Sequence, residues 1–185
     1  MKEIEILIEV KSSKEEAVKA LEKFTSHGIK KTLDIYFSDP LRKDLQPDKE
    51  NKLYRAFRLR QKDGKNSIAY KVDHFDETTW SHSDEFETEV EDFETMLHII
   101  KNLGLEELVR VDNEKHTYTT PEYEIVLEDV KGLGLFMEVE KLEEVPDEKV
   151  AETKQEIREF LKSLNINLGE EQNVGKPELM LNKKN

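Results

Sequence analysis

The chain of 185 residues contains no cysteine. This absence excludes a disulfide framework, a cysteine-ligated metal and a thiol nucleophile. Long apolar runs are absent too, because no stretch approaches the roughly 20 apolar residues that a membrane-spanning helix needs. The first ten residues are apolar but are interrupted by Glu3, Glu5 and Glu9, which argues against a secretory signal. We therefore expect a cytoplasmic protein with no membrane partner.

Positive charge is scarce, because the chain has 29 lysine and arginine residues but 42 aspartate and glutamate residues, which gives a net charge of -13. Surfaces that bind nucleic acids or anionic membranes usually carry an excess of lysine and arginine. The sequence therefore predicts no nucleic-acid partner, but it allows a small anionic ligand in a locally basic pocket. The apolar residues are strongly periodic, which predicts a folded chain, and the length favours a single domain over residues 1–185.

Three segments of the chain alternate glutamate with apolar or β-branched residues. They lie around Glu3 and Glu5, from Glu85 to Glu91, and at Glu138 and Glu140. Since alternate residues of a strand share one face, the carboxylates in each segment point to one side of the sheet and the residues between them to the other. A fourth segment, with Arg58 and Arg60, has the same periodicity and the opposite charge.

The order of these patterns predicts an α+β fold. We expect about eight strands and three helices, mostly in hairpin order. The expected strands are 2–10, 32–37, 54–61, 67–72, 84–91, 108–118, 123–130 and 135–142, and the expected helices are 13–28, 92–104 and 147–164. Residues 39–52 and 73–83 are polar and read as loops, and residues 165–185 as a polar tail. About eight strands can close around one small ligand, so we expect an eight-stranded antiparallel β-barrel, forming a tunnel, with flanking helices.

The charged strands supply the groups that a metal-bound triphosphate needs. Arginine engages two phosphate oxygens with its planar fork, and hard cations such as Mg²⁺ prefer carboxylate oxygens. The candidate carboxylates are Glu3, Glu5, Glu87, Glu89, Glu124, Glu128, Glu138 and Glu140, and the candidate cations are Arg58, Arg60, Lys71 and Lys115. A solvated outer face of an antiparallel sheet has the same periodicity, so the alternation leaves both interpretations open.

The motifs, taken in order, resemble a known family. They are Glu3-x-Glu5, Asp34-Ile-Tyr-Phe, Arg58-x-Arg60, Tyr70-Lys71, Glu87-x-Glu89, and Leu127-Glu-Asp-Val followed by Gly132-Leu-Gly-x-Phe-x-Glu138-x-Glu140. This order resembles the CYTH superfamily, the triphosphate tunnel metalloenzymes, which includes class IV adenylyl cyclases and thiamine triphosphatases. The resemblance covers roughly residues 1–142.

The resemblance implies a role for each matching residue. It implies Mg²⁺ or Mn²⁺ ligands at Glu3, Glu5, Glu138 and Glu140, assisted by Glu128. It implies substrate-binding residues at Arg58, Arg60, Lys71 and Lys115, with Glu87 and Glu89 lining the tunnel. Residues 165–185 correspond to a polar tail or a lid, and a homodimer is expected from the same resemblance. The resemblance leaves the catalytic residue unknown.

Two positions depart from the family pattern. Leu7 stands where the family has lysine after Glu-x-Glu, and Asn113 stands where it often has lysine in the sixth strand. The leading prediction is a class IV adenylyl cyclase-like enzyme that converts ATP to cyclic AMP and pyrophosphate. The alternatives are a thiamine triphosphatase or inorganic triphosphatase, and a non-catalytic nucleotide- or polyphosphate-binding module, which Leu7 and Asn113 favour.

Overall fold

The strands of the protein form one antiparallel sheet. The computed structural model describes residues 2–77 and 79–184, so Met1, Thr78 in the expected loop 73–83 and Asn185 in the expected tail lie outside it. In this part of the chain ten strands pair in the order β1-β6-β5-β4-β3-β7-β8-β9-β2-β10. The strands are β1 (Lys2–Glu3), β2 (Glu5–Val10), β3 (Thr25–Ser38), β4 (Arg55–Lys62), β5 (Lys65–Asp76), β6 (Thr79–Val90), β7 (Glu106–Thr119), β8 (Tyr123–Val130), β9 (Gly134–Lys141) and β10 (Leu168–Gln172).

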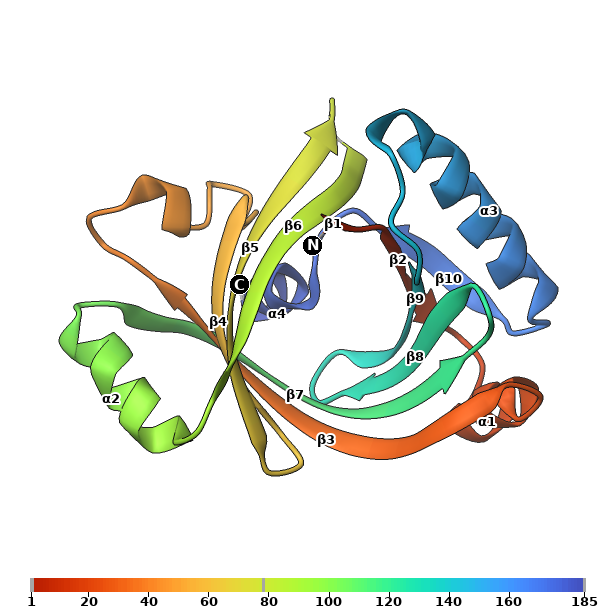
Figure 1. Ribbon diagram of the computed structural model, residues 1–185, viewed down its shortest axis with the longest axis horizontal. Helices are drawn as coiled ribbons and strands as arrows, with labels where there is room; N and C mark the ends of the chain where they lie inside the picture. The colour runs from red at the N-terminus through yellow and green to blue at the C-terminus, as the bar shows by residue number, and fades with distance from the viewer. Residues whose placement is uncertain (1, 78, 185) are drawn as a thin grey trace.

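The N-terminal segment joins the two ends of this sheet. Only Ile4 separates β1 from β2, yet β1 pairs with β6 and β2 pairs with β9. The sheet therefore curls around a central space (Figure 1). If β1 and β2 are counted as one strand, the described part of the chain has the eight strands that the sequence predicted, with β10 added beside β2. The predicted α+β class with an antiparallel sheet is confirmed.

The helices lie in two different places. Within residues 2–77 and 79–184 they are α1 (Lys14–Leu21), α2 (Phe93–Asn102), α3 (Val150–Ser163) and α4 (Lys176–Lys184), with short 3₁₀ turns at Lys43–Leu45 and Asp147–Lys149. Figure 1 shows α1, α2 and α3 on the outside of the curled sheet, whereas α4 is seen through its opening. None of these described helices is long and apolar enough to cross a membrane.

Each side of the curled sheet has its own apolar core. The outer core under α1 and α3 includes Ile6, Leu127 and Met137, and a second outer cluster under α2 includes Ile35 and Leu59. A third cluster lies on the inner face, where α4 packs; its members are Leu7, Tyr36, Val109, Val111, Val130 and Phe136, against which Leu179, Met180 and Leu181 pack. We call this set the inner apolar cluster. It fills one end of the interior and leaves the other end to polar side chains.

Three expectations about local structure are wrong. Residues 73–83 were expected to be a loop, but β5 continues to Asp76 and β6 begins at Thr79. Polar groups of this segment bond to one another: the Trp80 indole donates to Ser83 Oγ, which donates to Asp73. The first helix ends at Leu21 instead of Gly28, and β3 starts at Thr25. The segment 165–185 contains β10 and α4, which the sequence analysis did not predict.

A matched pair of leucine substitutions tests the position of the outer core. Leu127 is fully buried and Leu41 is 94% exposed. We expect Leu127→Ala to lower the free energy of unfolding by about 2–5 kcal/mol, through lost burial and the cavity left behind. Leu41→Ala should change it by less than about 0.5 kcal/mol. Urea unfolding measures both, and equal midpoints for the two variants would contradict the assignment of Leu127 to the core.

Candidate active site

The inner face of the sheet surrounds a cavity of about 230 Å³. Its basic lining residues are Arg58, Arg60, Lys62, Lys71, Lys115 and Lys176, and its acidic ones are Glu3, Glu5, Asp73, Glu85, Glu87, Glu124, Glu138, Glu140 and Glu178. The alternation in the sequence therefore placed most of the charges correctly, because Glu3, Glu5, Arg58, Arg60, Glu138 and Glu140 face inward while Ile4, Leu59 and Val139 between them pack outward. Acidic residues outnumber basic ones along this wall, so the cavity favours an anion that arrives together with a cation.

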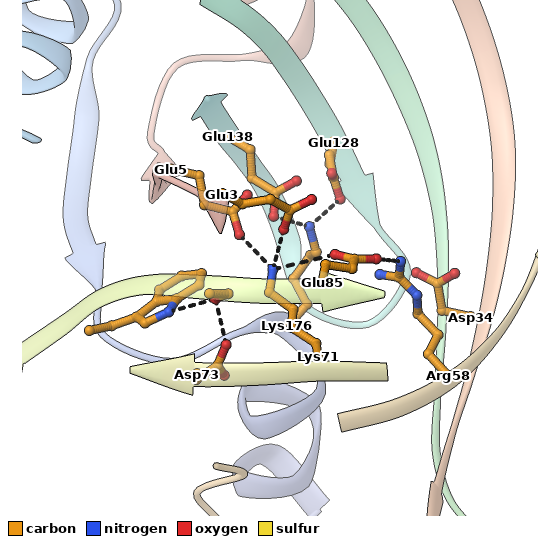
Figure 2. Close-up of polar contacts among 12 residues, drawn as sticks. Glu3, Glu5, Asp34, Arg58, Lys71, Asp73, Glu85, Glu128, Glu138 and Lys176 are labelled. Atoms are coloured by element: carbon orange, nitrogen blue, oxygen red, sulfur yellow. Dashed lines mark hydrogen bonds and ion pairs between the residues drawn. The ribbon is translucent and has the colours of Figure 1, made fainter. Parts of the chain in front are cut away.

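One part of the wall is a group of four glutamates, Glu3, Glu5, Glu124 and Glu140, which we call the carboxylate cluster. Strand pairing places Glu140 opposite Glu5 on one side and opposite Glu124 on the other. Lys71 Nζ lies 2.9 Å from Glu3 Oε2 and 3.0 Å from Glu5 Oε1 (Figure 2). One ammonium therefore balances several carboxylates.

The carboxylate cluster carries more negative charge than its surroundings neutralise. Burial raises the pKa of Glu140 to about 8, and repulsion from Glu5, Glu3 and Glu124 adds to this effect. Burial likewise raises the pKa of Glu3 to about 7 against the attraction of Lys71. A carboxylate held in such surroundings gains stability from any further positive charge.

The arginines on β4 form the opposite wall. Arg60 donates from Nε and Nη2 to the two carboxylate oxygens of Asp34, at 2.7 and 2.8 Å. Burial acts to raise the pKa of Asp34, but the charge and hydrogen bonds of Arg60 hold it well below its usual range. Arg58 Nη2 lies 2.8 Å from Glu85 Oε1 (Figure 2), while its buried Nε has no hydrogen-bond partner among the described residues. Arg58 thus keeps a donor for a further acceptor.

A second buried ionic group joins β7, β8, β9 and α4. Glu128 is fully buried and lies 2.8 Å from Lys115 Nζ and 2.9 Å from Lys176 Nζ. Lys176 also lies 2.5 Å from Glu138 Oε1. Asn113 donates from Nδ2 to Glu128 Oε2 at 2.7 Å. The oxygens of Glu128 are therefore engaged by groups of the protein itself.

The structure brings most of the predicted site residues together. The residues of the prediction that line the cavity are Glu3, Glu5, Arg58, Arg60, Lys71, Glu87, Lys115, Glu138 and Glu140. Glu128 lies just behind the lining, in contact with Lys115. Glu89 was expected to line the tunnel, but it is exposed and is not part of the cavity wall, because β6 has by then passed beyond the cavity.

The sequence analysis described residues 165–185 as a polar tail or a lid but named no site residue among them. Gly175, Lys176, Pro177 and Glu178 all line the cavity. Burial raises the pKa of Glu178 to about 7, and its Oε2 has no hydrogen-bond partner among the residues that the structure describes. The available signal was Leu179-Met180-Leu181, an apolar run in an otherwise polar tail, but it gave no indication of which wall of the sheet the tail would contact.

The chemistry of the carboxylate cluster suits a hard divalent cation. Its donors are carboxylate oxygens, which Mg²⁺ and Mn²⁺ prefer, and they are undercompensated by Lys71. In the described part of the chain, however, no three acidic or histidine side chains converge closely enough to hold a metal ion as they stand. Glu3 and Glu5 would have to exchange their contacts with Lys71 for contacts with the metal.

Comparison with known proteins assigns the chain to a family. Residues 1–171 match the family described as the CYTH domain. The protein therefore belongs to the CYTH family, as its motifs indicated.

Its relatives carry two kinds of description. The chain is 34% identical over 168 residues to "Putative adenylate cyclase MJ0240" of Methanocaldococcus jannaschii, with 90% of this chain and 91% of that protein covered. The PH1819 protein of Pyrococcus horikoshii OT3 superposes with a TM-score of 0.81 at 24% identity, covering 98% and 99% of the two chains. "Putative adenylyl cyclase HpAC1" from Hippeastrum, described as having a dominant triphosphatase activity, has a TM-score of 0.71 at 19% identity, with 98% and 96% covered. At these identities the two structures show the shared fold alone.

The raised pKa of Glu140 predicts how stability depends on pH without metal. A carboxyl group with a raised pKa in the folded state favours folding below its unfolded value near 4.5, and this contribution is lost as the pH rises through about 8. In EDTA, we expect the melting temperature to fall between pH 5 and pH 8.5. The fall should be smaller in Glu140→Gln, which has no charge to repel.

Glu89→Gln is the matched control, since Glu89 is exposed outside the cavity wall. This variant should keep the full decline in melting temperature. The same pH dependence in both variants would contradict the charge crowding at Glu140. Differential scanning fluorimetry across the pH range makes the measurement.

Proposed function

We propose that the protein is a metal-dependent enzyme that acts on a triphosphate held in the central cavity. The observation that carries this proposal is that the lining of one cavity contains both the carboxylate cluster and the cations Arg58, Arg60 and Lys115. A triphosphate with a divalent cation needs both kinds of charge. The family relationship and the name of the relative, "Putative adenylate cyclase MJ0240", support the assignment.

Each charged group has a task in this proposal. Arg58 offers its unpartnered Nε to a phosphate oxygen, and Lys115 lies on the neighbouring wall, with Glu128 behind it. Arg60 is held rigidly by Asp34, so its contribution is a fixed positive field rather than a free donor. The carboxylate cluster, with Glu138, would hold Mg²⁺ or Mn²⁺, which when bound neutralises developing charge on the phosphates.

Adenylyl cyclisation is the leading reaction. In it the ribose 3′-oxygen of ATP attacks the α-phosphorus, the bond from that phosphorus to the bridging oxygen of the β-phosphate breaks, and pyrophosphate leaves. The 3′-hydroxyl loses its proton to solvent or to a cavity carboxylate. The substrate is bound with its triphosphate against the arginines and its nucleoside toward the opening of the sheet.

Hydrolysis of inorganic or thiamine triphosphate is the second candidate, and the size of the cavity favours it. The volume of about 230 Å³ lies below the ~300–1,000 Å³ of pockets that enclose whole drug-sized ligands. An inorganic triphosphate, or the triphosphate end of a larger molecule, suits this volume better than an entire nucleotide. The triphosphatase activity described for the plant structural neighbour is the same kind of reaction.

Product analysis tests the proposal directly. We would incubate the protein with ATP, thiamine triphosphate or inorganic triphosphate, each with Mg²⁺, Mn²⁺ or EDTA, and separate the products by chromatography with mass detection. Cyclic AMP with pyrophosphate identifies the cyclase, and orthophosphate identifies the triphosphatase. EDTA should abolish either activity. If the protein binds a triphosphate but leaves every substrate unchanged, the proposal of an enzyme is wrong. The alternative is then the non-catalytic binding module that Leu7 and Asn113 favour.

A matched pair of arginine substitutions tests the role of the cavity wall. Arg58→Met should lower kcat/KM by about 100-fold or more, because it removes a preorganised donor to the phosphates. Arg55→Met on the same strand should have little effect, since Arg55 is exposed and lies outside the cavity lining. Steady-state kinetics measures both, with thermal melting as the check on folding. Equal loss in the two variants would contradict a specific role for Arg58.

A further inference from the structure

Lys71 occupies the place in the carboxylate cluster that a divalent cation would need. Its Nζ lies 2.9 Å from Glu3 Oε2, 3.0 Å from Glu5 Oε1 and 3.9 Å from Glu85 Oε2 (Figure 2). A metal ion at Glu3 and Glu5 therefore requires that the ammonium leave both carboxylates. Because Lys71 lines the interior cavity, and a desolvated ammonium without a partner is costly, the affinity for the metal depends on what receives Lys71.

Asp73 is a carboxylate that can receive it. Asp73 follows Lys71 by two residues on β5, so both side chains lie on the inner face, where both line the cavity. Its Oδ1 accepts a hydrogen bond from Ser83 Oγ at 2.6 Å (Figure 2). Burial raises the pKa of Asp73, although Lys71 and Ser83 act in the opposite direction. The Asp73 carboxylate is therefore stabilised further if the ammonium comes closer.

The indole of Trp80 lies beside the same ammonium. Lys71 Nζ is 5.5 Å from the centroid of the Trp80 ring, which is within the range of a cation–π contact. The indole Nε1 donates to Ser83 Oγ at 3.1 Å, so Ser83 connects Trp80 with Asp73. Lys154 of α3 donates to the Trp80 carbonyl and places its own ammonium 5.4 Å from the ring. These contacts hold the ring and the Asp73 carboxylate in fixed positions next to Lys71.

We propose that Asp73 and Trp80 are positioning residues that receive the ammonium of Lys71 when a divalent cation, Mg²⁺ or Mn²⁺, binds the carboxylate cluster. This inference rests on the proposed function, because it needs a divalent cation in the same cavity. Lys71 gives up its hydrogen bonds to Glu3 and Glu5, keeps its proton, and donates instead to Asp73, with its charge near the indole ring. Lys71 thus neutralises part of the carboxylate cluster in the free protein and leaves it without becoming an unpaired buried charge.

Trp80 reports this movement directly, because it is the only tryptophan of the chain. We would titrate the protein with MgCl₂ in the absence of any triphosphate and follow tryptophan fluorescence, with NaCl at equal ionic strength as the control. Mg²⁺ should change the emission in a saturable way, since the ammonium approaches the ring, and NaCl should not. The Lys71→Met variant should bind Mg²⁺ without this change, because it has no ammonium to move.

Isothermal titration calorimetry with Mg²⁺ alone gives a thermodynamic test. Lys71→Met should bind Mg²⁺ about 10-fold more tightly than the unsubstituted protein, because no charge-assisted hydrogen bonds have to be broken. Asp73→Asn should weaken binding by about 10-fold, because the displaced ammonium loses its acceptor, but it should have little effect in the Lys71→Met background. Asp76→Asn is the matched control, because it removes an exposed carboxylate from the same strand outside the cavity lining. This variant should keep the affinity of the unsubstituted protein.

Each result decides the inference. Mg²⁺ binding without a fluorescence change overturns it, and so does a Lys71→Met variant that binds Mg²⁺ no more tightly than the unsubstituted protein. An equal loss from Asp73→Asn with and without Lys71 also overturns it, because Asp73 then acts independently of Lys71. Thermal melting checks folding. The fluorescence and Lys71→Met tests keep Asp73 unchanged, so they decide the inference even where Asp73→Asn fails to fold.

The proposed reaction can fail separately. If Mg²⁺ binds with both expected signatures but ATP, thiamine triphosphate and inorganic triphosphate stay unchanged, the proposed reaction fails and the roles of Asp73 and Trp80 stand. If Mg²⁺ binds only together with tripolyphosphate, the inference fails while the proposed reaction stands. If Mg²⁺ binds in neither case, both fail.

Discussion

Charged side chains that point into a curled sheet must be neutralised inside it, and this constraint shapes the interior of the protein. A buried charge is tolerated where a partner and hydrogen bonds replace its hydration. Arg60 meets this requirement with Asp34, and Lys176 meets it with Glu128 and Glu138. These pairs fix the positions of the strands and of α4 relative to one another, so the geometry of the site is also part of the packing of the fold.

The carboxylate cluster is where this neutralisation is incomplete. Lys71 contacts Glu3 and Glu5, but Glu140 faces other glutamates, and its pKa is raised to about 8 by burial and by their charge. An uncompensated group of this kind costs stability in the free protein, and a functional ligand is the usual compensation. The interior therefore combines cations that are largely paired, apart from Arg58 Nε, with a group of carboxylates that Lys71 neutralises only in part.

Most of the inward-facing charges could be predicted from the sequence, because side chains alternate between the two faces of a strand. The alternation at Glu3, Arg58 and Glu138 fixed which side chains share a face, and the hairpin order fixed that the strands are antiparallel. The failures have local causes. Asp73 and Ser83 were expected in a loop because polar side chains are usually exposed to solvent. Here Ser83 donates a hydrogen bond to Asp73 across the sheet, so both residues fit within strands. The site residue Glu89 was misplaced because periodicity carries no information on where a cavity ends.

By itself the sequence determined most of the strand segments and most of the inward-facing charges, since these follow from short-range periodicity; the triphosphate and metal that it predicts as ligands stay predictions. The tertiary structure decided which carboxylates share a cation and which stay crowded, because those contacts join strands far apart in the chain. It also decided the place of α4. The apolar residues around Leu179 indicated that the tail packs against the rest of the protein. Lys176 contacts Glu138 because Leu7 and its neighbours form an apolar surface inside the curled sheet, on which α4 packs.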